Sequence, residues 1–177
     1  MDNSSSTAGT LRALRRLVRA LRLADRAAEA RLGLSAAQLF VLERLAEGPV
    51  GSMAELAGRT LTDASSVSVV VQRLADRGLV VRAASASDGR RTTLRLSASG
   101  RRLLVSAPRS PQAELLEALD SLGSPERSQL ERLLERLVRA MGIDESTPAP
   151  MFFEGEPRAE GTRRPPAAAR ARARSRG

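Results

Sequence analysis

The segment 65–74 contains four polar and three apolar residues at positions that would fall on opposite faces of a helix. The polar face of such a helix could recognise DNA bases. The polar residues are Ser65, Ser66, Ser68 and Gln72, and the apolar residues are Val67, Val70 and Leu74. Ser and Gln side chains hydrogen-bond to base edges and phosphates. One face of such a helix would therefore meet a duplex while the other packs on a core. An ordinary solvent-exposed polar surface is the alternative.

A second group of candidate residues lies in the loop 85–91, which contains the turn-forming pair Asp88-Gly89. Arg90 at the tip of a hairpin could enter the minor groove, where negative potential concentrates. Asp88 would orient this guanidinium or brace the turn, because phosphate would repel a carboxylate. Arg91 is a further candidate contact. The alternative is a solvated turn with a weak surface ion pair.

Three further residues complete the candidate DNA-binding set. Arg59 and Arg73 are plausible phosphate contacts by charge, although each could equally be a surface charge. Ser52 opens the short helix that precedes the candidate reading helix. Its pattern, Ser52-Met-Ala-Glu55, is that of a capping box.

The candidate reading segment is ambiguous, because its run of β-branched residues at 67–71 favours a strand. Its flanks favour a helix: Asp63 and Ser65 are N-cap options, and Gly78 suits the left-handed position after a helix. In that ending, Leu79 would contact Leu74. We therefore predict a helix.

Residues 79–84 and 92–97 are predicted strands, since apolar and polar residues alternate in the second of them. A short helix, a tight turn, a second helix and a basic hairpin together make a winged helix-turn-helix. The predicted fold is mainly α with a small β-hairpin wing.

Amphipathic helices flank this unit. One is predicted over residues 10–32, and a capping box at Ser35-Ala-Ala-Gln38 opens the next. Pro108 and Pro111 should kink or break the helix that follows the wing. A last helix should start at Ser124-Pro125-Glu126 and end at Gly142. The apolar stripes of the first and last helices are wide enough to pack against a second subunit.

Composition limits the chemistry. The chain has 177 residues, no Cys and no His, so we expect no thiol chemistry, no metal site that uses these residues, no cofactor and no imidazole base. All 29 basic residues are Arg, and the net charge is +9. Guanidinium groups pair with phosphate through two hydrogen bonds. The N-terminus lacks the pattern of a secretory signal, so we expect a cytoplasmic protein without membrane contact.

The predicted domain organisation has three parts. Residues 1–9 should be disordered, and residues 10–142 should form one helical domain. Its winged helix-turn-helix core spans about 35–100, with dimerisation helices at about 10–32 and 98–142. Residues 143–177 should be a disordered tail rich in Arg, Pro and Ala. Residues 151–177 carry seven Arg and three acids, which could attract nucleic acid weakly or simply be solvated.

Several motifs together resemble the MarR family of bacterial transcriptional regulators across roughly residues 10–142. They are Leu34-Ser-Ala-Ala-Gln-Leu-Phe-Val-Leu42, Glu55-Leu-Ala57, Arg73-Leu74, Arg77-Gly-Leu-Val80, Asp88-Gly-Arg90 and Leu94-Arg-Leu-Ser-Ala-Ser-Gly100. The resemblance implies a homodimer whose two winged units bind a near-palindromic operator. It also implies a repressor released by a small effector, phenolic or anionic, held between the first, second and Pro-containing helices.

Two features depart from the family pattern. The reading helix often carries a basic residue where this chain has Val69, so base recognition would use the serines, Gln72 and an apolar contact. Because Cys is absent, the peroxide-sensing mode of the family is excluded.

Two other functions remain as alternatives. A nonspecific nucleoid-associated or partner-recruiting protein would use the basic tail and show little preference between specific and random DNA. An enzyme would have to act through acids, Ser and Arg alone, and no paired arrangement of these is present, so we predict that the chain is not an enzyme.

Overall fold

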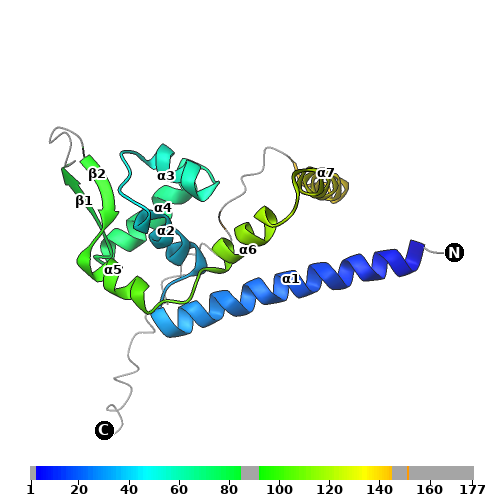
Figure 1. The fold of residues 1–177 in the computed structure, drawn as a ribbon, viewed down its shortest axis with the longest axis horizontal. Coiled ribbons are helices and arrows are strands. Elements are labelled where there is room, and N and C mark those ends of the chain that lie inside the picture. The colour runs from blue at the N-terminus through cyan, green and yellow to red at the C-terminus, as the bar shows by residue number, and fades with distance from the viewer. Residues whose placement is uncertain (1–2, 85–91, 145–150, 152–177) are drawn as a thin grey trace, which may run out of the picture.

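The computed structural model describes residues 3–84, 92–144 and 151, and within them seven helices and one hairpin (Figure 1). The elements, in chain order, are α1 (Asn3–Leu32), α2 (Ala36–Ala46), α3 (Met53–Thr60), α4 (Ala64–Asp76), β1 (Val80–Ala84), β2 (Thr92–Leu96), α5 (Ala98–Val105), α6 (Pro111–Asp120) and α7 (Ser124–Ala140). The predicted fold class is confirmed: helices predominate, and a small antiparallel hairpin follows the helix-turn-helix.

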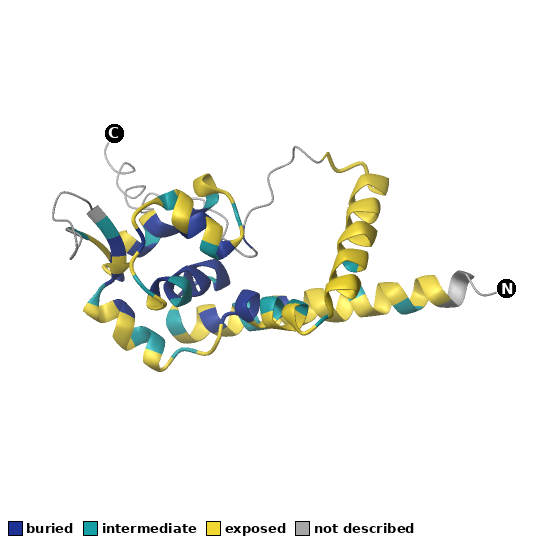
Figure 2. Cartoon of the chain, turned by 45° about the horizontal axis from the view of Figure 1, so that its top comes forward, coloured by how far each residue is buried: buried dark blue, intermediate teal, exposed yellow. Residues whose placement is uncertain are grey.

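The core is built around α2, whose buried residues are Ala36, Ala37, Gln38, Leu39, Phe40, Val41, Leu42 and Leu45. The predicted capping box starts this helix: Gln38 N donates to Ser35 Oγ at 3.3 Å, and Ser35 N donates to Gln38 Oε1 at 3.0 Å. Figure 2 shows the buried residues gathered where α2, α3, α4 and the hairpin meet, while α1 and α7 are mostly exposed.

The valine-rich segment is a helix, as predicted. Asp63 caps α4, and its apolar face is buried. Leu79 N donates to Leu74 O at 3.0 Å, and Gly78 N donates to Ala75 O at 2.8 Å, with Gly78 at φ +66°. This is the predicted Schellman ending. It turns the chain directly from α4 into β1.

The hairpin pairs Val80 with Leu96 and Ala84 with Thr92. Val50, in the loop after α2, adds an isolated bridge to Leu94 and so ties the hairpin to the core. Helix α5 starts tightly against β1, because a Cβ on Gly100 would lie 2.2 Å from the carbonyl oxygen of Leu79. Glycine at this position is what permits the approach.

The two prolines separate α5 from α6, as predicted. Helix α5 ends at Val105, and α6 begins at Pro111 with Ser110 as its N-cap. Glu43 of α2 fixes this start: Ser110 N donates to Glu43 Oε1 at 2.7 Å, and Ser110 Oγ donates to Glu43 Oε2. Burial raises the pKa of Glu43 above its ordinary value, and the hydrogen bonds from Ser110 offset part of that rise.

Helix α1 corrects the prediction that residues 1–9 are disordered, because the helix already begins at Asn3. The segment contains no proline, and Thr10 Oγ1 donates to Ser6 O at 3.0 Å across one helical turn. The helix ends near Gly33, as predicted, with Gly33 at φ +64°. Thirty residues make it roughly 45 Å long, and it extends well beyond the core (Figure 1).

A single carboxylate joins α1 to the start of α2. Asp25 Oδ1 accepts a hydrogen bond of 2.8 Å from Ala36 N. Burial raises the pKa of Asp25, while the bond from Ala36 lowers it. Leu21 and Ala28 are the buried apolar residues on the described part of α1.

The predicted last helix is confirmed, but it begins at Ser124 with Gly123 as the cap, so that Pro125 is its second residue. None of its residues is buried. The predicted disordered tail needs one correction at Met151, which is 4% exposed and packs in the core cluster. Apolar burial explains this placement. The rest of the tail after Asp144 lies outside the described residues.

Candidate nucleic-acid interface

The turn between α3 and α4 sets the angle of the candidate reading helix. Ser52 caps α3 by accepting from Glu55 N at 3.1 Å. The predicted capping box is only half formed, since the Glu55 side chain accepts from Gly51 N at 2.8 Å instead of from Ser52 N. At the other end, Leu61 takes the left-handed conformation at φ 53° and is 73% exposed.

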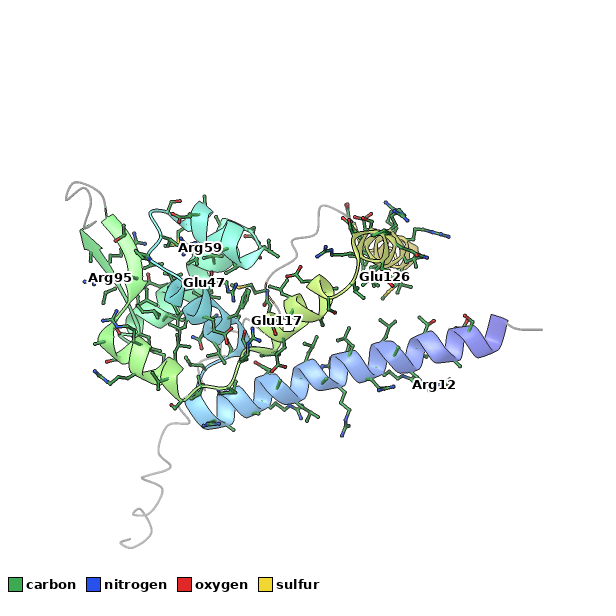
Figure 3. All side chains as sticks on the ribbon, viewed as in Figure 1. Arg12, Glu47, Arg59, Arg95, Glu117 and Glu126 are labelled. Carbon is green, nitrogen blue, oxygen red and sulfur yellow. The ribbon has the colours of Figure 1, made fainter. Side chains whose placement is uncertain are left out.

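Arg59, in the last turn of α3, ties this helix to the loop before it. Its guanidinium donates to Gly48 O at 2.9 Å, to Pro49 O at 3.3 Å and to Glu55 Oε1 at 2.7 Å. These bonds hold the loop after α2 against α3 (Figure 3). Three of its five N–H donors are thus used within the fold, and the ion pair with Glu55 offsets the charge that suggests a phosphate contact.

Helix α4 divides into a buried and an exposed face. Its buried residues are Val67, Val70, Val71 and Leu74. Ser65, Ser68 and Gln72 are exposed, and Ser66 is half-buried. Val69 is 47% exposed beside them, an apolar side chain on a polar face. The predicted candidates for base recognition therefore do share one accessible surface.

Asp63 organises the first turn of this surface. Its carboxylate accepts from Ser66 N at 2.8 Å, from Ser66 Oγ at 2.9 Å and from Ser65 Oγ. These bonds, the one from Ser65 foremost, hold the pKa of Asp63 well below its ordinary value. The carboxylate is therefore ionised, and both serine hydroxyls use their protons on it.

The far end of α4 has two further contacts. Gln72 Nε2 donates to Asp76 Oδ1 at 2.7 Å, and the exposed amide keeps its oxygen acceptor and a second N–H. Arg77 donates to Leu32 O at 3.3 Å and to Gly33 O. It thus joins the C-terminal end of the reading helix to that of α1. Arg73 is half-buried and already makes a contact within the fold.

The hairpin adds positive charge next to α4. Arg82 on β1 and Arg95 on β2 are exposed, and Figure 3 shows Arg95 on the hairpin. The predicted tip residues Asp88, Arg90 and Arg91 lie outside the described residues. The segment 85–91 that contains them joins the paired strand ends Ala84 and Thr92.

Sequence reasoning missed two residues that shape this interface, Asp63 and Arg77, and a third, Glu43, that shapes the start of α6. Asp63 was recognised only as a capping option, although the spacing of Ser65 and Ser66 is a local signal for its bonds. Arg77 and Glu43 have partners 44 and 67 positions away, so no local signal could reveal them.

The sequence is similar to known regulators. The sequence profile of the MarR family matches residues 32–91. The HTH-type transcriptional repressor Rv2887 of Mycobacterium tuberculosis is 34% identical over 106 residues, which cover 60% of this chain and 76% of the relative. The chain belongs to the MarR family. The family predicted from sequence motifs is thereby confirmed.

Solved structures of MarR proteins resemble the chain as well. A complex of the M. tuberculosis MarR family protein Rv2887 with salicylic acid is 34% identical, with a TM-score of 0.44 and coverage of 70% of this chain and 92% of that one. A MarR family protein from Bacillus stearothermophilus is 24% identical, with a TM-score of 0.48 and coverage of 79% and 98%.

As a MarR protein, the chain is a helix-turn-helix transcriptional regulator, and its relatives are regulators, not enzymes. Among the helices that the structure describes, none is both long and apolar enough to cross a bilayer.

Proposed function

We propose that this MarR protein is a homodimeric repressor that binds a near-palindromic operator in the cytoplasm and is released by a small molecule. The observation that carries this proposal is the exposed polar face of α4, fixed over a buried valine face and flanked by a hairpin with exposed arginines. A helix of this kind enters the major groove while a wing contacts the neighbouring minor groove.

Base recognition would rely mainly on acceptors. Because Ser65 and Ser66 donate to the ionised Asp63, their lone pairs are what they can offer to DNA. In the major groove, lone pairs match the amino groups of cytosine and adenine. Gln72 presents its amide oxygen in the same sense. Ser68 can donate or accept, and Val69 can contact a thymine methyl group.

Contacts to the DNA backbone and the minor groove would come from the wing and from Arg73. Arg90 is assigned to the minor groove, Arg91 to a neighbouring phosphate and Asp88 to bracing the turn. Ser52 is exposed at the start of α3, and we assign it a further hydrogen bond at the rim of this surface. Arg59 is left out of the proposed contacts because three of its donors tie α3 to the loop before it and Glu55 offsets its charge.

Dimerisation is supported by apolar side chains that a single chain leaves exposed. On α7 and just after it, these are Leu133, Leu134, Leu137, Val138, Met141 and Ile143, and on α1 they are Leu11, Leu17, Val18 and Leu23. On α7 these residues repeat at helical spacing and form a stripe on one face, and an exposed apolar stripe indicates an interface. A second copy is the partner that the two-fold symmetry of an operator requires.

Release by a ligand is supported by the sequence relative Rv2887, which has been crystallised with salicylic acid and with p-aminosalicylic acid. Repression is supported by the same relative, which is described as a repressor.

The test is selection of bound fragments from random duplex DNA, followed by titration of the selected and a scrambled duplex. A specific regulator should prefer the selected duplex by roughly 10³-fold or more, and the site should be near-palindromic. Affinity should fall steeply with salt, because phosphates are neutralised. A ratio near one would favour the alternative, a nonspecific nucleoid-associated or partner-recruiting protein.

A further inference from the structure

A pocket of about 880 Å³ lies between the end of α2, strand β2 and helix α5. Its volume is in the range of sites that hold small organic molecules. Residues of the loop after α2 form one wall, with Pro49 among them, and residues of β2 and α5 form the others. No residue of α1 or α6 lines it, so it differs from the site that the family resemblance implies.

Much of the lining is apolar. Leu45 and Leu96 belong to the buried core and contribute to the pocket from α2 and β2. Leu104 and Val105 contribute from α5. Val105 is 89% exposed, which is unusual for a β-branched apolar side chain beside an apolar pocket. An apolar occupant would cover it.

Two guanidinium groups add charge to this lining. Arg95 comes from the hairpin and Arg101 from α5, and no acidic residue lines the pocket. Arg101 Nη1 donates to Leu96 O at 3.1 Å, which orients its remaining donors. The nearby carboxylate of Glu47 pairs with Arg44 at 2.7 Å. The charges of the pocket therefore remain uncompensated by its own lining.

We propose that this pocket binds an amphipathic organic anion, with a carboxylate or sulfonate between Arg95 and Arg101 and an apolar body against Leu104 and Val105. A guanidinium bonds to a carboxylate through paired, charge-assisted hydrogen bonds. A neutral apolar molecule would leave both guanidinium groups without a ligand partner. A small anion with no apolar part would leave Val105 exposed to water.

The pocket also links such a ligand to DNA binding, and in this respect the inference rests on the proposed function. Arg95 belongs to the wing strand, so a bound anion neutralises charge that would otherwise attract phosphate. A ligand here therefore lowers the affinity for DNA.

The experiment uses 1-naphthoate as the probe and the uncharged 1-naphthamide as its matched control, titrated by calorimetry into the full chain without DNA. The Arg95→Gln and Arg101→Gln variants should each weaken naphthoate binding by about tenfold or more. Val105→Asp, at an exposed position that should not disturb folding, should weaken it as well. Arg102→Gln is the control, because Arg102 is exposed on the same helix and does not line the pocket.

Equal binding of naphthoate and naphthamide would overturn the proposal, as would wild-type affinity in both arginine variants. Failure of naphthoate to bind the full chain would also overturn it. A parallel titration of the selected duplex separates the two proposals. If the chain prefers no duplex, the proposed function is wrong, but calorimetry still shows whether the pocket binds the anion.

Discussion

Arg77 at the end of the reading helix α4 donates to the carbonyl oxygen of Gly33, which ends the long helix α1. Its second bond, to Leu32 O, is 3.3 Å long. Positive charge at a helix C-terminus is favourable, because the last carbonyls lack partners within the helix. One side chain therefore couples the proposed dimerisation helix to the proposed DNA-reading helix.

The Arg77→Ala variant should lose both bonds and lower the free energy of unfolding by about 1 kcal/mol. The orientation of α4 relative to α1 should loosen too, so DNA affinity should fall while the dimer persists. Urea unfolding and a duplex titration measure these effects. Arg82→Ala on β1 is the stability control and should unfold like the wild type. Unchanged unfolding of Arg77→Ala would show that this contact contributes nothing to coupling.

The Gly100→Ala variant should lower the free energy of unfolding by about 1–3 kcal/mol. The new Cβ would meet the carbonyl oxygen of Leu79 at 2.2 Å, and a backbone atom cannot move aside as a flexible side chain can. Thermal or chemical unfolding measures the loss.

Gly58→Ala is the matched control for this glycine. Gly58 is a helical residue of α3, and nothing lies within 4 Å of a Cβ built there. Alanine should stabilise the chain by about 0.5–1 kcal/mol at this site. Equal effects of the two substitutions would contradict the close approach of α5 to β1.

Local features of the fold could be predicted because their signals lie close together in the sequence. The capping residues Ser35 and Asp63, the C′ glycine Gly78 and the proline Pro111 each mark a helix end, and the structure has a helix end at each of them. The valine-rich α4 illustrates this well, since its caps outweighed the strand preference of its interior.

Contacts between distant elements could not be predicted in the same way. The charge of Arg59 and its i,i+4 partner Glu55 could be read from the sequence, but the Gly48 and Pro49 carbonyls that the fold brings to it could not. The burial of Met151 depends likewise on a distant core. The exposed face of α4 was predictable, but the bonds to Asp63 that restrict Ser65 and Ser66 to accepting were not.

The Glu43→Gln variant should change how stability depends on pH. The pKa of Glu43 is raised above its ordinary 4.5, so the folded state binds this proton more readily than the unfolded chain. Ionised Glu43 thus costs stability above its folded pKa, and this cost disappears as pH falls through that pKa toward 4.5. Glutamine removes the titration but keeps an acceptor for Ser110 N.

We therefore expect the wild type to gain stability relative to Glu43→Gln as pH is lowered from 7 to 4.5. Chemical unfolding at several pH values gives this difference, in which the contributions of the other carboxylates cancel. Glu131→Gln on α7 is the control, and a constant offset between it and the wild type is expected. The same constant offset for Glu43→Gln would contradict the assignment.

The Leu137→Asp variant should dissociate the dimer. Leu137 is 42% exposed on α7, a helix with no buried residue, so a carboxylate there would meet the partner's apolar surface without disturbing the core. Light scattering after size exclusion should give a monomer, and circular dichroism should show an intact helical fold. Ser128→Asp, two and a half helical turns earlier and so on the opposite face of α7, should remain dimeric. A dimeric Leu137→Asp protein would exclude this stripe as the interface.

The Arg90→Ala variant should weaken operator binding by about 1–3 kcal/mol and leave the dimer intact. Its guanidinium is assigned to the minor groove, so the loss should appear with the selected duplex and should be larger when the minor groove at the wing is A·T-rich and narrow. A fluorescence titration at two salt concentrations separates this effect from a general loss of charge. Arg132→Ala on α7 removes the same charge far from the hairpin and should bind like the wild type. If Arg90→Ala also matches the wild type on the selected duplex, the wing has no part in recognition, and specificity must then come from α4 alone.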